Sequence, residues 1–470
     1  MRNLLKKLVG FSLGPILGAF ISFITVPVTT YFINPTEFGK ASMFTVVQTL
    51  IISFVYLGID QSFAKEYHQH SDKKKLFQNS LFLPLVFSGF LTIVIGIFRR
   101  QFSNILFGSF EYGSISVLFC IMIIFMVIER YVLLMIRMEE KALEYSFFSV
   151  FLKVIIFALT FIIILSGERD FLAIVYSTIF GQIIGDLILI IKYREYFRVK
   201  RDFLDSILLK SLLRFGLPLV ISASVTSLLN TTGRIFLRNY STFTELGIYT
   251  AALKITSLLN IVQTSFTSFW IPTAYRWNSK NKDIKHFQLI SELLLFVLSM
   301  GMMLLVFFKK YLMLILSNDY SATQYVFPLL CLTPLLYTLS ETTTLGVIFS
   351  GKSYYNIYVT VCALIPNVIL NILLVSKLGT IGTAIAQAVS YGVFYFLRTY
   401  FSKKCGFSFS TKKHDLCILV LFIVCCFNSF PIDKIAIINI IGFVTIVLIQ
   451  IGTLKKLQLL KKEPSSWNFD

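Results

Sequence analysis

Charged residues are scarce in this chain. Asp, Glu, Lys and Arg make up 14% of its 470 residues, and no long polar segment or Ser/Gly/Pro-rich linker divides it. Hydrophobic residues make up 56%, and the mean hydropathy is +0.78. A water-soluble domain of this length could not expose so much apolar surface without aggregating. The composition excludes a soluble protein and predicts one embedded in a membrane.

Residues that commonly bind metal ions are few and poorly spaced for that task. The seven cysteines lie almost all within apolar stretches and lack the close spacing of a metal site. The four histidines all fall in expected loops: His68, His70, His286 and His414. We expect no metal site and no other cofactor, with cysteines that serve as small apolar fillers.

Long apolar stretches dominate the chain. About fourteen of them, each of roughly 18 to 26 residues, run from one end to the other, and a helix needs about 20 apolar residues to cross a bilayer core. The expected fold class is an all-α polytopic membrane protein with about fourteen transmembrane helices. Their predicted ranges are 8–33, 41–62, 78–98, 114–136, 145–166, 171–191, 212–234, 246–273, 288–308, 325–349, 355–376, 379–400, 415–430 and 434–452.

Basic residues concentrate in alternate loops. With the N-terminus in the cytoplasm, the inner segments hold about three times as many Lys and Arg as the outer ones, which fixes the expected orientation. The first stretch follows Arg2, Lys6 and Lys7 and lacks a cleavage site, so we interpret it as a retained span. The net charge of +19 raises nucleic-acid binding as an alternative, but membrane topology explains the dispersed basic loops better.

An internal repeat organises the chain. Thr36 to Gly39 reads T-E-F-G, and Thr244 to Gly247 reads T-E-L-G, at an offset of 208 residues. Six helices separate the two motifs, so both halves enter the membrane from the same side and form a parallel repeat. We predict two six-helix bundles, 1–200 and 201–402, followed by two further helices and a cytoplasmic tail in 403–470.

Polar residues form a stripe along the predicted helix 246–273. At 100° per residue, Thr250, Lys254, Ser257, Thr264 and Ser268 share one side, with Asn260 just outside it. Lys254 lies roughly 10 Å below the outer end, so its ammonium could also snorkel to the surface. We favour a water-accessible, positively lined chamber between the two bundles, with Lys254 as a cation that attracts an anionic headgroup.

Other polar residues fall inside predicted spans. Lys153 and Asp186 are expected at similar depth, where they form an ion pair or act on substrate or ion; the same two readings apply to Glu129 with Arg130. Glu341 has no evident nearby cation, which makes it the better candidate for protonation or sodium binding. The remaining polar residues fit hydrogen bonds between helices somewhat better than sugar contact: Asn230, Asn367 and Asn371.

Three segments of the chain resemble the bacterial polysaccharide repeat-unit flippases of the MATE-like MOP superfamily. They are Gly14-Pro15 through Gly39, Arg234 to Tyr240 with Glu245 to Ile255, and Asn367 and Asn371 with Leu378 to Ala386. Length, helix count and repeat match over nearly the whole chain. One departure is Gly233, because relatives often carry an acidic residue immediately before the arginine at Arg234.

This resemblance implies a carrier, not an enzyme. It would move undecaprenyl-diphosphate-linked oligosaccharide (O-antigen or capsule units) from the inner to the outer leaflet of the bacterial cytoplasmic membrane, with both termini in the cytoplasm. Any coupling ion is expected to be H⁺ or Na⁺, and the other partners are membrane lipids and polysaccharide assembly proteins, without nucleic acid. The implied substrate-binding residues are Lys254, Lys153, Arg130, Arg234, Asn230, Asn260 and Ser257, and the ion-coupling candidates are Glu341, Asp186 and Glu129.

Two other functions compete with this one. A multidrug exporter of the same superfamily would favour organic cations and an acidic cavity, which Lys254 and Lys153 argue against. A membrane-embedded glycan polymerase or ligase would need a catalytic constellation on an extended outer loop, and here the outer loops are short.

Overall fold

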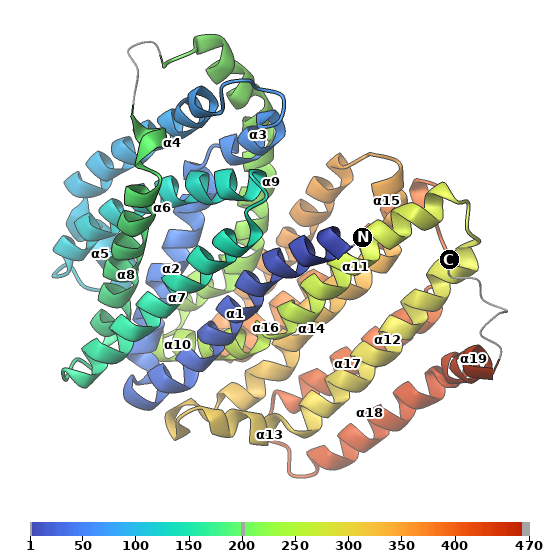
Figure 1. Cartoon of the computed structure of the whole chain (residues 1–470). Coiled ribbons are helices and arrows are strands. Elements are labelled where there is room, and N and C mark those ends of the chain that lie inside the picture. The colour runs from blue at the N-terminus through green and yellow to red at the C-terminus, as the bar shows by residue number, and fades with distance from the viewer. Residues whose placement is uncertain (1, 199–202, 463–470) are drawn as a thin grey trace. The chain divides into compact units, whose positions relative to one another are not determined.

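The computed structural model of the chain describes residues 2–198 and 203–462, with side chains over 13–198 and 203–456 apart from Pro15. Over these residues the secondary structure is helical, without strands (Figure 1). The chain divides into two compact units. Unit 1 holds Met1–Arg238 and Thr242–Gly247, and unit 2 holds Asn239–Ser241 and Ile248–Asp470. The predicted division at 200 and 402 follows the sequence repeat and stays a prediction.

Unit 1 is built from long helices joined by short turns. Its elements are α1 (Arg2–Phe32), α2 (Pro35–Val55), α3 (Ile59–Glu66), α4 (Lys73–Ile97), α5 (Arg99–Phe107), α6 (Gly113–Met138), α7 (Ala142–Leu165), α8 (Phe171–Lys192), a 3₁₀ turn (Arg194–Phe197) and most of α9 (Ser206–Tyr240).

Unit 2 is also built from helices joined by short turns. Helix α10 (Phe243–Thr256) begins in unit 1 and runs into unit 2. The rest are α11 (Leu259–Ser279), α12 (Ile284–Phe307), α13 (Lys309–Leu312), 3₁₀ turns (Met313–Ile315 and Asn318–Tyr320), α14 (Thr323–Thr343), α15 (Leu345–Phe349), α16 (Tyr354–Lys404), α17 (Lys412–Asn428), α18 (Ile435–Ile449) and α19 (Ile451–Lys462).

The described helices make this a multi-pass membrane protein. The fourteen predicted stretches lie mostly on helix, which confirms the all-α class, although a turn at 56–58 breaks the stretch 41–62 and another at 257–258 breaks the stretch 246–273. Within the described residues, nine helices are long and apolar enough to cross a membrane, and two shorter apolar helices cover Ile16–Phe32 and Ile435–Ile449. The predicted number of about fourteen spans is therefore not confirmed. Part of the difference lies in α16, whose 51 residues contain two helices that meet at a kink at Gly379, so two predicted spans count as one among the nine.

Helices α7 and α8 of unit 1 pack closely because α8 carries small residues on one side. A Cβ added at Gly181 would lie 2.7 Å from a side-chain carbon of Ile156, and one at Gly185 would lie 2.5 Å from Leu152. Two glycines four residues apart let membrane helices approach and gain van der Waals contact that larger residues would prevent. This packing positions the neighbouring side of α8, about 100° around the helix, which carries Gln182 and Asp186.

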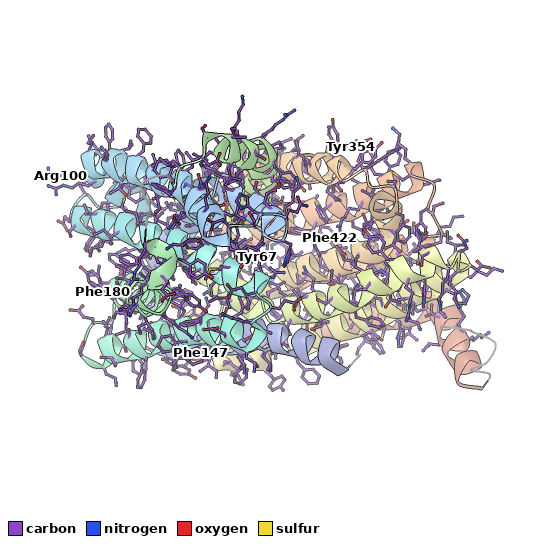
Figure 2. All side chains as sticks on the ribbon, turned by 45° about the horizontal axis from the view of Figure 1, so that its top comes forward. Tyr67, Arg100, Phe147, Phe180, Tyr354 and Phe422 are labelled. Carbon is purple, nitrogen blue, oxygen red and sulfur yellow. The ribbon has the colours of Figure 1, made fainter. Side chains whose placement is uncertain are left out.

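Aromatic residues fill the core of unit 1 and also cover its outside. The buried rings of Phe63, Phe77 and Tyr131 meet edge to face, with Phe63 at 6.5 Å from Phe77 and 6.1 Å from Tyr131. By contrast, Phe147 and Phe180 are among the exposed rings labelled in Figure 2. Exposed rings of this kind suit a surface that faces lipid.

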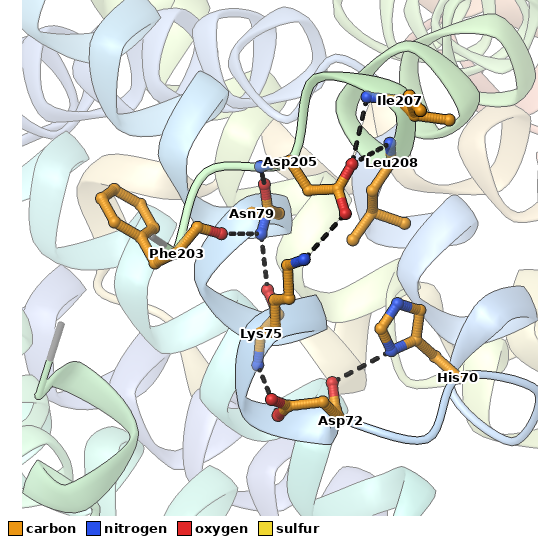
Figure 3. Close-up of polar contacts among 8 residues, drawn as sticks. All are labelled: His70, Asp72, Lys75, Asn79, Phe203, Asp205, Ile207 and Leu208. Carbon is orange, nitrogen blue, oxygen red and sulfur yellow. Dashed lines mark hydrogen bonds and ion pairs between the residues drawn. The ribbon is translucent and has the colours of Figure 1, made fainter. Parts of the chain in front are cut away.

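A polar network fastens the segment before α9 to α4 (Figure 3). The Lys75 ammonium pairs with the Asp205 carboxylate at 2.8 Å, and Asn79 donates to the carbonyl of Phe203 at 2.6 Å and accepts from the Asp205 amide at 2.9 Å. Asp205 also accepts from the amides of Ile207 and Leu208 and so caps α9. The Lys75 hydrogen bond lowers the pKa of the Asp205 carboxyl.

The two copies of the repeat motif meet inside unit 1. The Thr36 and Thr244 hydroxyls are hydrogen-bonded at 2.8 Å, although 208 residues separate them. A Cβ added at Gly39 would lie 1.9 Å from the carbonyl oxygen of Phe243, and one at Gly247 would lie 1.9 Å from that of Pro35. Each contact maps onto the other under the repeat offset, as a local two-fold axis requires. The predicted repeat is thereby confirmed at these two helix starts.

Equivalent residues also cap the two motif helices. The side chain of Asn34 accepts a hydrogen bond from the amide of Glu37 at 3.0 Å, and the Thr242 hydroxyl accepts one from the amide of Glu245 at 3.2 Å. Asn34 and Thr242 are 208 residues apart in the sequence, so the repeat extends to the local interactions that start each helix.

Helix α16 of unit 2 contains a sharp break at Gly379, whose backbone has φ 50° and ψ −126°. This combination lies outside the helical region and is accessible to glycine at little cost. The two parts of the helix remain joined by a hydrogen bond of 3.0 Å from the buried Asn367 to Gln387, and Asn371 donates to Asn367. The hydrogen bond between helices predicted for Asn367 is therefore confirmed.

Candidate functional site

Two acidic side chains lie together inside unit 1. Glu129 on α6 and Asp186 on α8 both accept hydrogen bonds from the side-chain nitrogen of Gln182, at 2.7 and 2.9 Å. Asp186 is fully buried, and its Oδ1 has no hydrogen-bond partner within the described residues. One amide nitrogen therefore holds two carboxylates within two hydrogen-bond lengths of each other. We call Glu129 and Asp186 the carboxylate pair.

The sequence of α8 explains this arrangement. Gln182 and Asp186 are four residues apart and share a side of the helix, while Gly181 and Gly185 lie one position earlier and meet α7. The amide of Gln182 reduces the cost of burying two carboxylates, because buried polar atoms need hydrogen-bond partners. Sequence reasoning found Glu129 and Asp186 but missed Gln182.

Arg130 has a partner other than its sequence neighbour. Its guanidinium pairs with Asp60 on α3 at 2.7 Å and lies over the ring of Tyr56, with its central carbon 5.5 Å from the ring centre. The local pair considered for Glu129 with Arg130 is not what the structure shows. Arg130 instead joins α6 to α3 through an ion pair in which Asp60 is almost fully buried.

Lys153 on α7 lies near the carboxylate pair but forms no ion pair with Asp186 in the described part of the chain. Its side chain is exposed, and its stem runs past α1, with Cγ 3.8 Å from the Cβ that a side chain at Gly18 would have. The positive charge of Lys153 acts electrostatically on Glu129. Three predicted site residues, Glu129, Lys153 and Asp186, are thus brought into one region of unit 1.

The polar stripe lies on α10 and α11. Lys254, Ser257 and Asn260 are exposed, and so are Thr264 and Ser268 further along, but Thr250, the first residue of the predicted stripe, is buried. On the other side Ala252 and Ile255 of α10 are buried, whereas Val262 and Phe269 of α11 are exposed. The predicted continuous helix is interrupted at Ser257 and Leu258, where α10 ends and α11 has yet to begin, and the Ser257 hydroxyl donates to the Lys254 carbonyl at 2.6 Å. This interruption sets the three residues around a helix junction.

Two predicted site residues lie on α9. Asn230 is exposed and Arg234 is half-buried, and the four-residue spacing places them on one side of the helix. The buried residue Gly233 occupies the position before Arg234, so no side chain there can pair with its guanidinium.

The expectation that Glu341 lacks a nearby cation is wrong. Its carboxylate pairs with Arg398 of α16 at 2.7 Å, and both side chains are nearly fully buried. Arg398 also donates to the Ser340 hydroxyl at 2.7 Å and lies over the Tyr337 and Phe394 rings at 5.2 and 5.1 Å. A guanidinium at this distance compensates the carboxylate charge, so the reason for choosing Glu341 as an ion-binding group is removed.

A second charged cluster in unit 2 was not anticipated. The buried Glu292 of α12 accepts from Lys456 of α19 at 2.9 Å and from Gln288 at 2.8 Å, and Lys413 of α17 lies at 3.4 Å. Beside it, Ser291 hydrogen-bonds the buried His414 at 2.8 Å. The cluster ties α12, α17 and α19 together, and its two lysines compensate the charge of Glu292.

A sequence signal for the missed charges was present. Asp60, Glu292 and Arg398 all fall inside predicted apolar stretches, where a lone charge is costly and therefore needs a partner. The partners themselves come from other helices and have no short-range signature. Within the described residues, no group of three or more His, Cys, Asp or Glu side chains is placed to hold a metal ion.

Comparisons with known proteins agree with this architecture. The sequence profile of a family described as polysaccharide biosynthesis protein matches residues 4–278, which is more than half of the chain. A protein of Haloferax volcanii, the probable low-salt glycan biosynthesis flippase Agl15, is 18% identical over 395 residues, covering 83% of this chain and 82% of its own.

Solved structures share the fold. The lipid II flippase MurJ in an inward closed conformation superposes with a TM-score of 0.70 at 15% identity, covering 97% of this chain and all of its own. An inward-facing multidrug resistance MATE family transporter of the MOP superfamily gives a TM-score of 0.61 at 16% identity, covering 85% of this chain and 97% of its own. At such identities the likeness establishes the fold alone.

Proposed function

From the premise that this chain belongs to the polysaccharide biosynthesis protein family, we propose that it is a flippase for undecaprenyl-diphosphate-linked oligosaccharide repeat units. It moves the polar headgroup from the inner to the outer leaflet of a bacterial cytoplasmic membrane by alternating access, with both chain ends on the cytoplasmic side. The names of its relatives support transport of lipid-linked glycans rather than catalysis.

The observation that carries this proposal is the exposed polar stripe on α10 and α11. In a chain with so few charges, Lys254, Ser257 and Asn260 stand exposed around a helix junction, and the same side continues with exposed hydroxyls. Polar side chains at membrane depth need water or a polar ligand. A diphosphate supplies the anion for Lys254, and sugar hydroxyls suit the amide and hydroxyl groups beside it.

The remaining predicted cations have secondary roles in this proposal. Lys153 is exposed and without an ion pair among the described residues, so it can contact an anionic headgroup. Arg130 already forms an ion pair with Asp60. Arg234 is half-buried, and Asn230 lies on the same side of α9. We therefore rank Lys254 first and Lys153 second as phosphate-binding groups.

The coupling ion in this proposal binds at the carboxylate pair. Two ionised carboxylates this close together repel, and the repulsion favours binding of H⁺ or another small cation between them. The Oδ1 of Asp186 has no hydrogen-bond partner among the described residues and can accept a proton or contact a cation. The positive charge of Lys153 acts on Glu129 and opposes cation binding there, which favours release of the ion. Glu341 has no such role because Arg398 already compensates it.

A reconstitution experiment tests the binding site. Proteoliposomes containing the purified protein would be loaded with a lipid-diphosphate oligosaccharide, and the fraction reaching the other leaflet would be measured with an impermeant glycan-modifying enzyme. We expect Lys254→Ala to lower the transfer rate about tenfold to a hundredfold, since a charge-assisted hydrogen bond is worth about 1.5–3 kcal/mol. Lys254→Arg should keep part of the rate because it keeps the charge.

The matched control for this experiment is Lys280→Ala, which removes an exposed lysine at the end of α11. It should transfer at the wild-type rate. Full transfer by Lys254→Ala would remove Lys254 from the substrate site. Transfer of organic cations instead of the glycolipid by the wild-type protein would favour the multidrug exporter.

A further inference from the structure

A small cavity lies in unit 2 where α14 and α16 end and α17 begins. It has a volume of about 240 Å³, and its walls come from the last residue of α14, the last turns of α16, the connecting loop and the first residue of α17. Sites for drug-sized molecules measure roughly 300–1,000 Å³, so this cavity suits a smaller group. We call it the loop cavity; its lining residues are Thr343, Thr399, Lys403, Phe407, Ser408, Phe409, Ser410, Thr411 and Lys412.

The charge of the loop cavity is uncompensated. Lys403 and Lys412 are both exposed, and neither forms an ion pair within the described residues, while no acidic residue lines the cavity. The basic residues around it behave differently, because Lys413 and Lys456 share Glu292 and Arg398 is paired with Glu341. Two ammonium groups on one small cavity therefore create a local positive potential that attracts an anion.

Hydroxyl groups supply the hydrogen bonds that an oxyanion needs. The exposed Ser408 and Ser410 make no hydrogen bond within the described part of the chain, so their hydroxyls are available. Thr399 donates to Thr343 at 2.9 Å, and both residues line the cavity. Donors from Ser and Thr together with ammonium groups are the usual contacts of phosphate oxygens.

The start of α17 adds to the same potential. Its N-cap residue, Thr411, makes no side-chain bond to the first turn, and instead donates to Asp415 at 3.4 Å. The first amide groups of a helix are unpaired and carry a partial positive charge, which favours an anion nearby. Asp415, the acidic residue of this turn, is half-buried and is not part of the lining.

We propose that the loop cavity binds a phosphate group, either as free phosphate or as the headgroup of an anionic phospholipid. Lys403 and Lys412 supply the charge, and Ser408 and Ser410 supply hydrogen bonds. Because the loop after α16 is one of those predicted to face the cytoplasm, the ligand would come from the cytosol or the inner leaflet. The site goes beyond the proposed transport and stands without it.

A different role for Lys403 must be separated from this one. Lys403 and Lys404 both lie in the last turn of α16, where a basic residue also offsets the helix dipole. That role predicts that both lysines contribute equally, and it predicts no anion affinity. Since only Lys403 lines the cavity, comparison of the two lysines distinguishes the roles.

The test measures binding to the full-length protein. In detergent, thermal stability would be followed against inorganic phosphate at constant ionic strength; in nanodiscs, it would be followed against the phosphatidylglycerol content of phosphatidylcholine bilayers. The double variant Lys403→Gln/Lys412→Gln should bind the stabilising anion at least tenfold more weakly than the wild type does. The matched control Lys404→Gln/Lys352→Gln removes two exposed lysines outside the lining and should bind as the wild type does.

Each result decides the proposal. Stabilisation of the wild type and the control by phosphate identifies the free ion, and stabilisation by phosphatidylglycerol alone identifies the lipid headgroup; both support the site if the double variant loses the effect. If the double variant does not fold, Ser408→Ala/Ser410→Ala should weaken binding about threefold without changing the charge. Failure of both anions to stabilise the wild type, or equal loss in the control, would overturn the proposal.

Discussion

Buried acidic side chains in this protein have two kinds of surroundings. Glu341 and Glu292 are buried and compensated by basic groups at 2.7 to 3.4 Å, whereas Asp186 is buried with one oxygen unbonded among the described residues and another carboxylate beside it. Compensated charges join helices, and an uncompensated pair is suited to bind and release an ion. This difference separates structural charges from candidate functional ones.

The ion pair of Glu341 and Arg398 should be structural. Arg398→Leu leaves a buried carboxylate without its partner and should lower stability by about 3–5 kcal/mol, while the double variant Glu341→Leu/Arg398→Leu should recover part of the loss. Unfolding in detergent would be followed by tryptophan fluorescence. Lys280→Leu, at an exposed position, serves as the control. An Arg398→Leu protein as stable as the wild type would show that the pair contributes nothing.

The carboxylate pair should govern the response to an ion gradient. Asp186→Asn should abolish any stimulation of glycolipid transfer by an imposed H⁺ or Na⁺ gradient while leaving transfer without a gradient measurable, because the amide cannot take up a cation as a carboxylate does. The readout is the ratio of transfer rates with and without each gradient. Glu168→Gln, which removes an exposed carboxylate, should keep the wild-type ratio. An unchanged ratio in Asp186→Asn would place coupling elsewhere.

Residue-level prediction from the sequence succeeded where composition was the signal. Glu129, Lys153 and Asp186 stood out as charges in apolar stretches, and the structure brings them into one region. The partners Asp60 and Arg398 could not be assigned, because their ion pairs join helices that are distant in sequence. The prediction for Glu341 was wrong for this reason, since its partner Arg398 lies 57 residues further along the chain. Gln182 lies four residues before Asp186 on the same helix, so its spacing was a local signal that sequence reasoning missed.

Helix positions follow from apolar length, whereas breaks and short helices do not. The predicted stretches lie mostly on helix, but α3 and α5 are short and amphipathic and carry no span-length signal. The junction between α10 and α11 lies in a sequence without proline or glycine, so no local sequence signal predicts it. The break in α16 does coincide with Gly379, next to the predicted boundary.

The crossing of α2 with the start of α10 should be intolerant of any side chain. Gly39→Ala would place a methyl group 1.9 Å from the backbone oxygen of Phe243, which forces the backbones apart and should lower the thermal midpoint or prevent folding. Gly89→Ala on α4 meets no atom within 4 Å and should be neutral or slightly stabilising. Equal midpoints for the two variants, measured in detergent, would contradict the close crossing.

At the scale of the whole molecule, the orientation in the membrane is a prediction from charge. In a variant without native cysteines, Glu111→Cys lies in an expected outer loop and should react with an impermeant maleimide in intact cells. Gln69→Cys lies in an expected inner loop and should react only after permeabilisation. The reverse labelling pattern would invert the topology and place the loop cavity on the outer side.

The fold of the whole chain could be predicted from hydropathy and from the repeat, since both are properties of long segments. The predicted number of membrane crossings is not confirmed, because α16 contains two expected spans that meet at a kink without a loop, and other helices are too short or too polar to qualify by length and composition. The roles of the charges depend on which helices meet, and that is set by packing across the entire chain.

The reciprocal contact between Gly39 and Gly247 makes the starts of α2 and α10 depend on each other. Each glycine leaves the space that the backbone of the other copy of the motif occupies. A side chain at either position would therefore displace both helices at once, so a change in one copy of the motif cannot be confined to that copy.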